Sequence, residues 1–320
     1  MYNPAHFRFR SSGIALVLVL WIIVMLSIMA ASFSLNLRRE IDLVGNVRGE
    51  AEAGSVAEAG IYYAMLRLIA NNEQKKWRSD GSVYEILFAG ARVRIRIYDE
   101  GGKYDLNTSQ PLLLIGLMQK MGLSDVEPEA LVDAMEDWKD SDSDKRPKGA
   151  EADEYEDAGR TYGPSNKPFQ TIEELRLVLG IAGDLYRRLE PLTTVYNSTP
   201  GIDPSKSSKE VLMTLPGVTE EIIDTYLEQR AASSQNNPPP FPFPPEGNLQ
   251  VTQAIGVAFS VHSEALFPDG RHAGVSAVIT NANNPPPPFV FVEWKKQFPG
   301  EGSLFGESVV VVEPNGADGP

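Results

Sequence analysis

Residues 14–33 read IALVLVLWIIVMLSIMAASF, and no charged residue occurs from Ser11 to Leu37. An α-helix rises about 1.5 Å per residue, and about 20 apolar residues are needed to cross a bilayer core of roughly 30 Å. The sequence therefore predicts one membrane-spanning helix close to the amino terminus.

The basic residues that flank this run nearly balance, with Arg8 and Arg10 before it and Arg38 and Arg39 after it. The whole chain carries 43 Asp and Glu against 29 Lys and Arg, a formal net charge of -14. Short basic ends stay in the cytoplasm, and a long domain crosses a membrane largely regardless of its charge. We therefore expect a single-pass protein of the cell inner membrane with its main domain in the periplasm.

The composition is that of a folded protein. Hydrophobic residues make up 42% and charged residues 22%, which excludes wholesale disorder, collagen and coiled-coil rods. The net charge of -14 would repel a phosphate backbone, so we expect no nucleic-acid partner. The absence of cysteine excludes disulfides, thiolate metal sites and a cysteine nucleophile.

The helical pattern continues beyond the membrane run. No proline occurs between Arg10 and Ile69. Apolar residues recur at spacings of three and four, which places them on one helix face. They are Ile41, Val44, Val47, Ala57, Ile61, Ala64 and Leu68. A membrane helix that continues as a docked helix is typical of type IV pilins.

Three interpretations of the amino terminus remain open. The first is a secretory signal cleaved near the small residues 30–32, and the second is a plain membrane anchor. The third is a prepilin-type leader that ends at Gly13, so that the mature chain begins at Ile14 and keeps the whole apolar helix.

A dense acidic segment lies in the middle of the chain. Asp140, Asp142 and Asp144 alternate, and Glu151 and Glu154 follow closely. Calcium binds six to eight oxygen ligands and tolerates irregular loops, so this segment predicts a calcium site. The spacing matches an EF-hand loop at the twelfth position, a glutamate, but not at the sixth, where lysine replaces glycine. The alternative is a solvated acidic loop.

The remaining pattern predicts an α+β fold. Residues 92–98 alternate between arginine and apolar side chains, as a half-buried strand does. Three further segments rich in β-branched and aromatic residues predict strands at 251–261, 273–280 and 289–294, and 309–312 could add an edge strand. Between these strands, residues 105 to about 200 show helical periodicity with helix starts at Pro111, Pro128 and Thr171.

Several short strings, in this order and spacing, resemble the minor pseudopilin K family of type II secretion systems. The resemblance extends from about Gly13 to Gly217. The strings that carry it are DEGGKYDLN (99–107), LVDA (131–134), DWKDSD (137–142), GAE (149–151) and TIEELRLV (171–178).

The resemblance implies a type IV pilin-like fold, with a long amino-terminal helix on an antiparallel sheet and a large inserted all-helical domain that binds calcium. It also implies a place at the pseudopilus tip with the minor pseudopilins I and J, above the major pseudopilin. A prepilin peptidase would cut after Gly13 and methylate Ile14. Most pilin-type subunits carry glutamate as the fifth mature residue, where this chain has Leu18. A tip subunit has no neighbour above it, so a carboxylate at this position would be unpaired. An unpaired charge is costly in lipid.

The predicted organisation has five parts: a leader at 1–13, a transmembrane segment at 14–37, the pilin helix and first strands at 38–104, the helical insertion at 105–247, and the closing strands at 248–320. We expect no enzyme, because no nucleophile or histidine base accompanies the carboxylates. Two other functions remain open: a membrane-anchored periplasmic calcium-binding or adhesion protein, and an envelope hydrolase that uses the Asp140 cluster.

Overall fold

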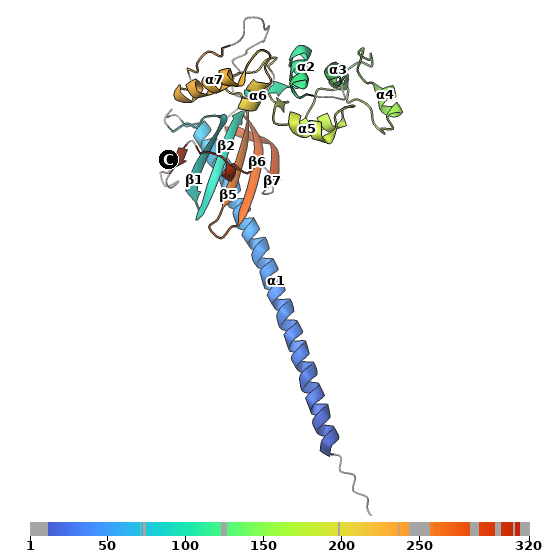
Figure 1. The fold of residues 1–320 in the computed structure, drawn as a ribbon, viewed down its shortest axis with the longest axis vertical. Helices are drawn as coiled ribbons and strands as arrows, with labels where there is room; N and C mark the ends of the chain where they lie inside the picture. The colour runs from blue at the N-terminus through green and yellow to red at the C-terminus, as the bar shows by residue number, and fades with distance from the viewer. Residues whose placement is uncertain are drawn as a thin grey trace, which may run out of the picture. The chain divides into compact units, whose positions relative to one another are not determined.

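The computed structural model describes residues 12–70, 72, 75–122, 127–197, 199–235, 237–242, 257–281, 288–297, 302–309 and 311–313 (Figure 1). The chain forms two compact units, residues 1–53 and 54–320. Most of the predicted leader and the first part of the predicted strand 251–261 lie outside the described residues.

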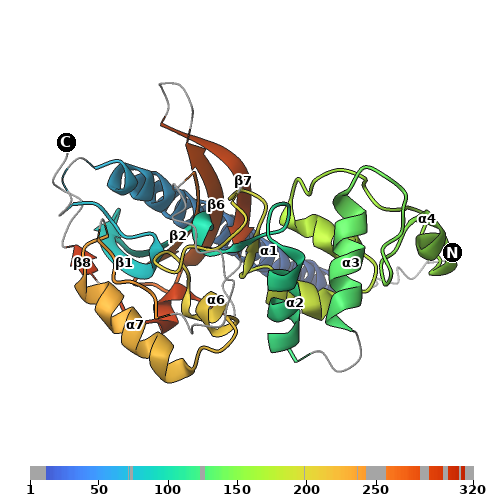
Figure 2. The same cartoon turned by 90° about the horizontal axis from the view of Figure 1, so that it is seen from above.

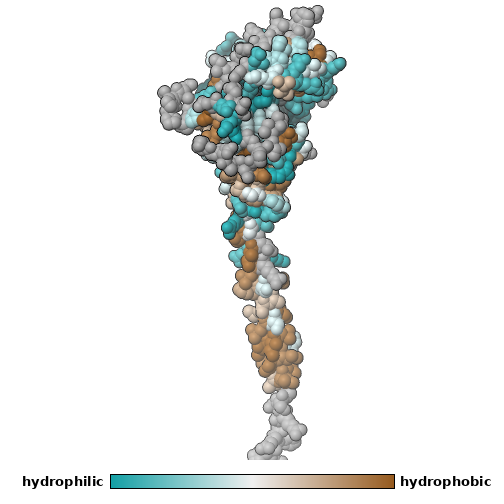
Figure 3. Space-filling model, turned by 90° about the vertical axis from the view of Figure 1, so that its left-hand side faces the viewer, coloured by the Kyte–Doolittle hydropathy of each residue, from teal (hydrophilic) through white to brown (hydrophobic). Residues whose placement is uncertain are grey.

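The first unit contains the amino-terminal part of helix α1, which spans Ser12–Leu68. Its most apolar window has a mean hydropathy of 3.0 and none of it is buried, so the helix is long and apolar enough to cross a membrane. Figure 3 shows the apolar surface gathered on this part of the helix. Ile14 and Leu18, the predicted first and fifth mature residues, are both exposed there.

The second unit contains a six-stranded sheet in the order β7-β6-β5-β2-β1-β8. All pairs are antiparallel except β1 with β8. The strands are β1 (Asp80–Phe88), β2 (Ala91–Asp99), β5 (Ala258–Leu266), β6 (His272–Asn281), β7 (Phe289–Gln297) and β8 (Val311–Glu313). The α+β class is confirmed, and each predicted strand overlaps an observed one, although β5 extends five residues beyond the predicted end at Val261.

The carboxyl-terminal part of α1 contributes to the core of this unit. Ala57, Ile61, Ala64 and Leu68 are buried, as their spacing predicts. The helix approaches the sheet most closely at Gly60, where a Cβ atom would overlap Ser263 Oγ and lie 3.0 Å from Val93 Cγ1. Only glycine fits at this point without a shift of its neighbours.

The helical region lies between β2 and β5 in the sequence. It contains α2 (Pro111–Lys120), α3 (Pro128–Lys139), α4 (Ala152–Asp157), α5 (Gly183–Leu189), α6 (Lys209–Met213) and α7 (Glu220–Ala232). Short 3-10 turns lie at η1 (Glu100–Gly102) and η2 (Ile172–Leu177), and a third, η3 (Leu304–Gly306), follows β7. Thr171 and Glu174 form the predicted capping box, but the segment that they cap is 3-10 rather than α-helical.

The helical region has its own hydrophobic cluster, which extends along the chain from Tyr104 to Tyr226. Two short parallel strands, β3 (Tyr104–Asp105) and β4 (Thr193–Thr194), pair where the chain enters and leaves α2–α5. Figure 2 shows α7 near β1, whereas α3 and α4 lie on the far side of α2. We call the pair β3–β4 the neck.

The close approach at Gly60 gives a stability prediction. Gly60→Ala should lower the free energy of unfolding by about 1–3 kcal/mol, because the added methyl group overpacks the contact with Ser263 and Val93. Chemical denaturation of the detergent-solubilised protein, followed by near-UV circular dichroism, measures the change.

The control is Gly54→Ala in the same helix. A Cβ atom at Gly54 meets nothing within 4 Å, so alanine there should raise the stability by up to about 1 kcal/mol through helix propensity. Equal stabilities of the two variants would show that the packing at Gly60 is not tight.

Candidate functional site

The acidic segment is organised around Asp137, in the last turn of α3. Asp137 is fully buried, and both of its oxygens lie 3.3 Å from the backbone nitrogen of Arg146. Gly149 passes so close that a Cβ atom there would overlap Asp137 Oδ2. Burial raises the pKa of Asp137, and the neighbouring Asp140 raises it further, against the backbone hydrogen bonds that lower it. The loop after α3 thus wraps around a buried carboxyl group.

Three of the five predicted ligands gather near Asp137. Burial raises the pKa of Glu151, and repulsion from Asp137, Asp140 and Asp142 raises it further. Burial and the neighbouring Asp142 also raise the pKa of Asp140. Mutual repulsion of this kind requires carboxylates that lie close together without enough positive charge between them.

The other two predicted ligands are placed differently. Asp144 is exposed, and its backbone nitrogen donates to Asp142 Oδ1 at 2.9 Å. Glu154 forms an ion pair with Lys145 and accepts from the backbone nitrogen of Glu151 at 3.0 Å. It therefore acts as the capping-box residue of α4.

The chemistry of the cluster fits a hard cation. Asp140 Oδ1 and Glu151 Oε1 are buried and have no hydrogen-bond partner, which is costly unless another group satisfies them. Arg146 supplies the nearest positive charge, with Nε 3.4 Å from Asp137 Oδ1 and Nη2 3.7 Å from Asp140 Oδ2. Within the described part of the chain, however, no three acidic or histidine side chains already converge on one metal position.

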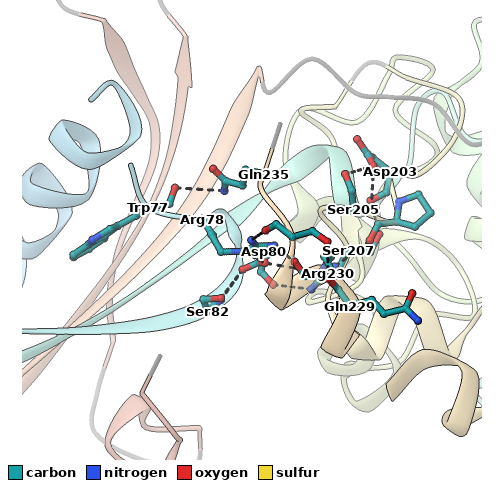
Figure 4. Close-up of polar contacts among 12 residues, drawn as sticks. Trp77, Arg78, Asp80, Ser82, Asp203, Ser205, Ser207, Gln229, Arg230 and Gln235 are labelled. Atoms are coloured by element: carbon teal, nitrogen blue, oxygen red, sulfur yellow. Dashed lines mark hydrogen bonds and ion pairs between the residues drawn. The ribbon is translucent and has the colours of Figure 1, made fainter. Parts of the chain in front are cut away.

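A second group of charged residues fixes the helical region to the sheet, at the point where β1 begins (Figure 4). Arg78 Nε donates to Asp80 Oδ2 at 2.7 Å, and its Nη atoms donate to the backbone oxygens of Ser233 and Arg230 at 2.9 Å. Arg230 Nε, on α7, lies 3.8 Å from Asp80 Oδ2. We call Arg78, Asp80 and Arg230 the joint.

The joint is largely dehydrated, since the side chains of Asp80 and Arg230 are 9% and 6% exposed. Arg230 Nη1 also donates to the backbone oxygens of Pro204 and Ser207, at 3.0 and 2.6 Å. Burial raises the pKa of Asp80, but Arg230, Ser82 and Arg78 outweigh it and leave the pKa below its usual value. Sequence reasoning missed the joint, because its members lie about 150 residues apart and only folding brings them together.

The segment from Asp99 to Asn107, which carries part of the family resemblance, has a structural role. Asp99 accepts from the backbone nitrogen of Gly101 at 2.9 Å and forms an ion pair with Lys206 at 2.9 Å. Gly102 has no room for a Cβ atom, which would lie 2.6 Å from the backbone of Lys206. Asp105 accepts from the backbone nitrogens of Asn107, Thr108 and Asn197. These residues shape the turn from the sheet into the neck.

The comparisons with known proteins match this arrangement. Residues 98–198 match the family model described as type II secretion system protein K. This part of the chain is similar to protein K of type II secretion systems. The matched range begins at the end of β2 and ends just after β4, so it contains the neck, α2–α5 and the acidic cluster.

Curated relatives support the same family resemblance, which is thereby confirmed. Protein K of Pseudomonas aeruginosa is 26% identical over 59% of this chain and 61% of its own length. Protein K of Klebsiella pneumoniae is 24% identical over 85% of this chain and 90% of its own length. The chain thus spans less than two thirds of the first of these relatives.

A solved structure shows the same fold. A chain in the crystal structure of the GspK-GspI-GspJ complex, from the type 2 secretion system of enterotoxigenic Escherichia coli, aligns with a TM-score of 0.52. The alignment covers 82% of this chain and 99% of that chain at 15% identity. The likeness supports the type IV pilin-like fold with a helical insertion.

The joint predicts a pH dependence. Arg230, Ser82 and Arg78 hold the folded-state pKa of Asp80 below its ordinary value of 3.8. Its stabilising contribution is therefore present above pH 3.8 and is lost as the pH falls through the folded-state pKa. Asp80→Asn should cost about 3–5 kcal/mol at neutral pH, because Arg230 is left buried without its partner. Denaturation at several pH values should show the wild-type advantage disappear at low pH.

Asp269→Asn is the matched control. Asp269 pairs with Arg271 at 2.7 Å in the exposed turn between β5 and β6, where an ion pair is screened by solvent. If Asp269→Asn lowered the free energy of unfolding as much as Asp80→Asn, the joint would stabilise the protein no more than an exposed ion pair does.

Proposed function

We propose that this chain is a minor pseudopilin of a type II secretion system, and that it sits at the pseudopilus tip with minor pseudopilins of the I and J type. The single observation that carries the proposal is the combination of a pilin-like helix and sheet with a protein K domain inserted between β2 and β5. The fold supplies the means of assembly into a fibre, and the inserted domain distinguishes this subunit from a simple pilin.

The exposed apolar side chains of α1 support assembly in the membrane. Within the first unit, Ile41, Val44 and Val47 are exposed as well as the residues of the apolar run. Helices associate in lipid by packing rather than by burial from water. In this role the apolar helix spans the inner membrane, contacts the helices of neighbouring subunits, including the major pseudopilin, and leaves the second unit in the periplasm.

Complex formation tests the function. The full chain, coexpressed with I-type and J-type minor pseudopilins from the same organism, should copurify with both in detergent at a fixed ratio. A coexpressed type IV pilin from another system serves as the control and should not copurify. A monomeric chain in the presence of both partners would contradict the proposed role.

Processing provides a separate prediction. A prepilin peptidase should remove residues 1–13 and leave Ile14 as an N-methylated first residue, because Gly13 precedes the apolar run. Amino-terminal mass spectrometry of the membrane-extracted protein detects both changes. A Gly13→Leu variant should keep its leader, while Ser12→Ala, one residue away, should be cut normally. A mature chain that begins near residue 33 would instead identify a secretory signal.

Calcium binding is the remaining part of the proposal. The cluster of Asp137, Asp140, Asp142 and Glu151 would hold the ion, supported by the buried unpartnered oxygens of Asp140 and Glu151. A bound divalent cation would neutralise the mutual repulsion that raises the pKa values of Asp140 and Glu151. It would fix the loop after α3 against α4, and Asp144 and Glu154 would remain the less favoured ligands because of their other contacts.

Calcium should therefore stabilise the protein. A ligand at 100 times its dissociation constant adds about 2.7 kcal/mol to the stability, so calcium should raise the melting temperature and a chelator should reverse the rise. Asp140→Asn should abolish this response. Asp157→Asn, an exposed residue at the end of α4, is the control and should keep it. An unchanged melting temperature with calcium in the wild-type protein would refute the site.

A further inference from the structure

A group of charged side chains at β7 forms a second link between the helical region and the sheet. Lys295 Nζ, on β7, forms ion pairs with Glu173 of η2 and with Glu190 at the end of α5, the latter at 3.9 Å. It also lies 2.6 Å from Glu293 on its own strand. Burial lowers the pKa of Lys295, but hydrogen bonds with Glu173 and Glu293 outweigh it and raise the pKa, so the lysine stays charged.

This link and the joint differ in their exposure to solvent. The side chains of Lys295 and Glu173 are 41% and 38% exposed, whereas those of Asp80 and Arg230 are 9% and 6% exposed. Exposed ion pairs contribute little to stability and are screened by salt. A buried ion pair with satisfied hydrogen bonds is hard to separate, because separation leaves a buried charge without a partner. If the helical region moves, it separates from the sheet at Lys295 and stays attached at the joint.

A cleft of about 670 Å³ lies beside Lys295 and Glu190. Its sheet side includes Arg96, His262 and Ser276, which are cross-strand neighbours on β2, β5 and β6. Lys295 continues this row onto β7, opposite Ser276. Its other side includes Arg187 and Tyr196 of the helical region. The two walls are therefore not packed against each other, and the space between them leaves room for relative movement.

The helical region also has a hydrophobic cluster of its own. This cluster runs from Tyr104, in the neck, to Tyr226 on α7 and does not include the strands of the six-stranded sheet. Helices that share a core separate from the sheet move as a body more easily than they deform.

We propose that the helical region swings about the joint, and that Lys295 is the latch that holds the two walls of the cleft together. When the latch is closed, Glu173 and Glu190 are held against β7. When it opens, the partly exposed polar row on β2, β5 and β6 becomes more exposed. The latch depends on exposed charges, so ionic strength and any partner that competes for Lys295 or Glu173 shift the balance towards the open form. This inference does not depend on the proposed role in secretion.

Distance measurements between two spin labels test the latch. The chain has no cysteine, so Asp184→Cys on α5 and Pro268→Cys in the β5–β6 turn give one labelled pair on two exposed positions. Pulsed electron paramagnetic resonance of the full chain in detergent should show one narrow distance at low salt. In the Lys295→Met background the distribution should broaden and shift. Wild-type protein at 1 M salt, where the Debye length is about 3 Å, should shift in the same direction.

Lys167→Met, at an exposed lysine of the helical region, is the matched control for loss of one positive charge and should leave the low-salt distance unchanged. Circular dichroism should show the Lys295→Met variant to be folded. High salt should have no further effect on that variant if the latch is the salt-sensitive link. The same narrow distance in wild type, Lys295→Met and high salt would overturn the proposal, as would a wild-type distribution that is already broad at low salt.

Discussion

The pairing of β2 with β5 is the constraint on which the rest of the structure depends. Tyr98 lies opposite Ser260 and Asp99 opposite Phe259, although a whole helical region separates these strands in the sequence. Both ends of that region must therefore meet where these two central strands end. The entropic cost of closing a long loop grows only slowly with its length, so a folded insertion is tolerated if its ends are held. Asp99 with Lys206, and Asp80 with Arg230, hold them.

The charged residues of the second unit act in two different ways. At the joint, buried groups with several hydrogen bonds fix a single arrangement, since any alternative leaves a charge without a partner. At the acidic cluster, buried carboxylates lie near one another with unpartnered oxygens, an arrangement that favours binding of a cation. At β7 the charges are exposed and their attraction is weak. The same residue types thus differ in burial at the three places, which is why we assign fixation to the joint and propose cation binding and movement for the other two.

The candidate site was only partly predictable from sequence. The sequence indicated the cluster at Asp140, Asp142 and Glu151, because these three carboxylates lie within one short segment of the chain. The sequence did not indicate Asp137 as a member of the cluster. It lies on a helix three residues before Asp140, where an exposed side chain is expected, and only the folded loop buries it. Glu154 was interpreted as a ligand, yet its position three residues after Glu151 fits a capping box equally well, and the structure places it there.

The sequence by itself determined the long apolar helix, the strands β2, β5, β6 and β7, the class of fold and the family resemblance, because hydrophobic length, periodicity and ordered motifs are properties of neighbouring residues. It also determined the packing face of Ala57, Ile61 and Ala64, since helical spacing alone brings them together. It did not indicate β1. Only the tertiary structure decided that Arg78 and Arg230 meet at Asp80, that Gly60 touches Ser263, and that Lys295 reaches Glu173. Those contacts join residues far apart in the chain, and no local pattern encodes which distant partner a side chain will meet.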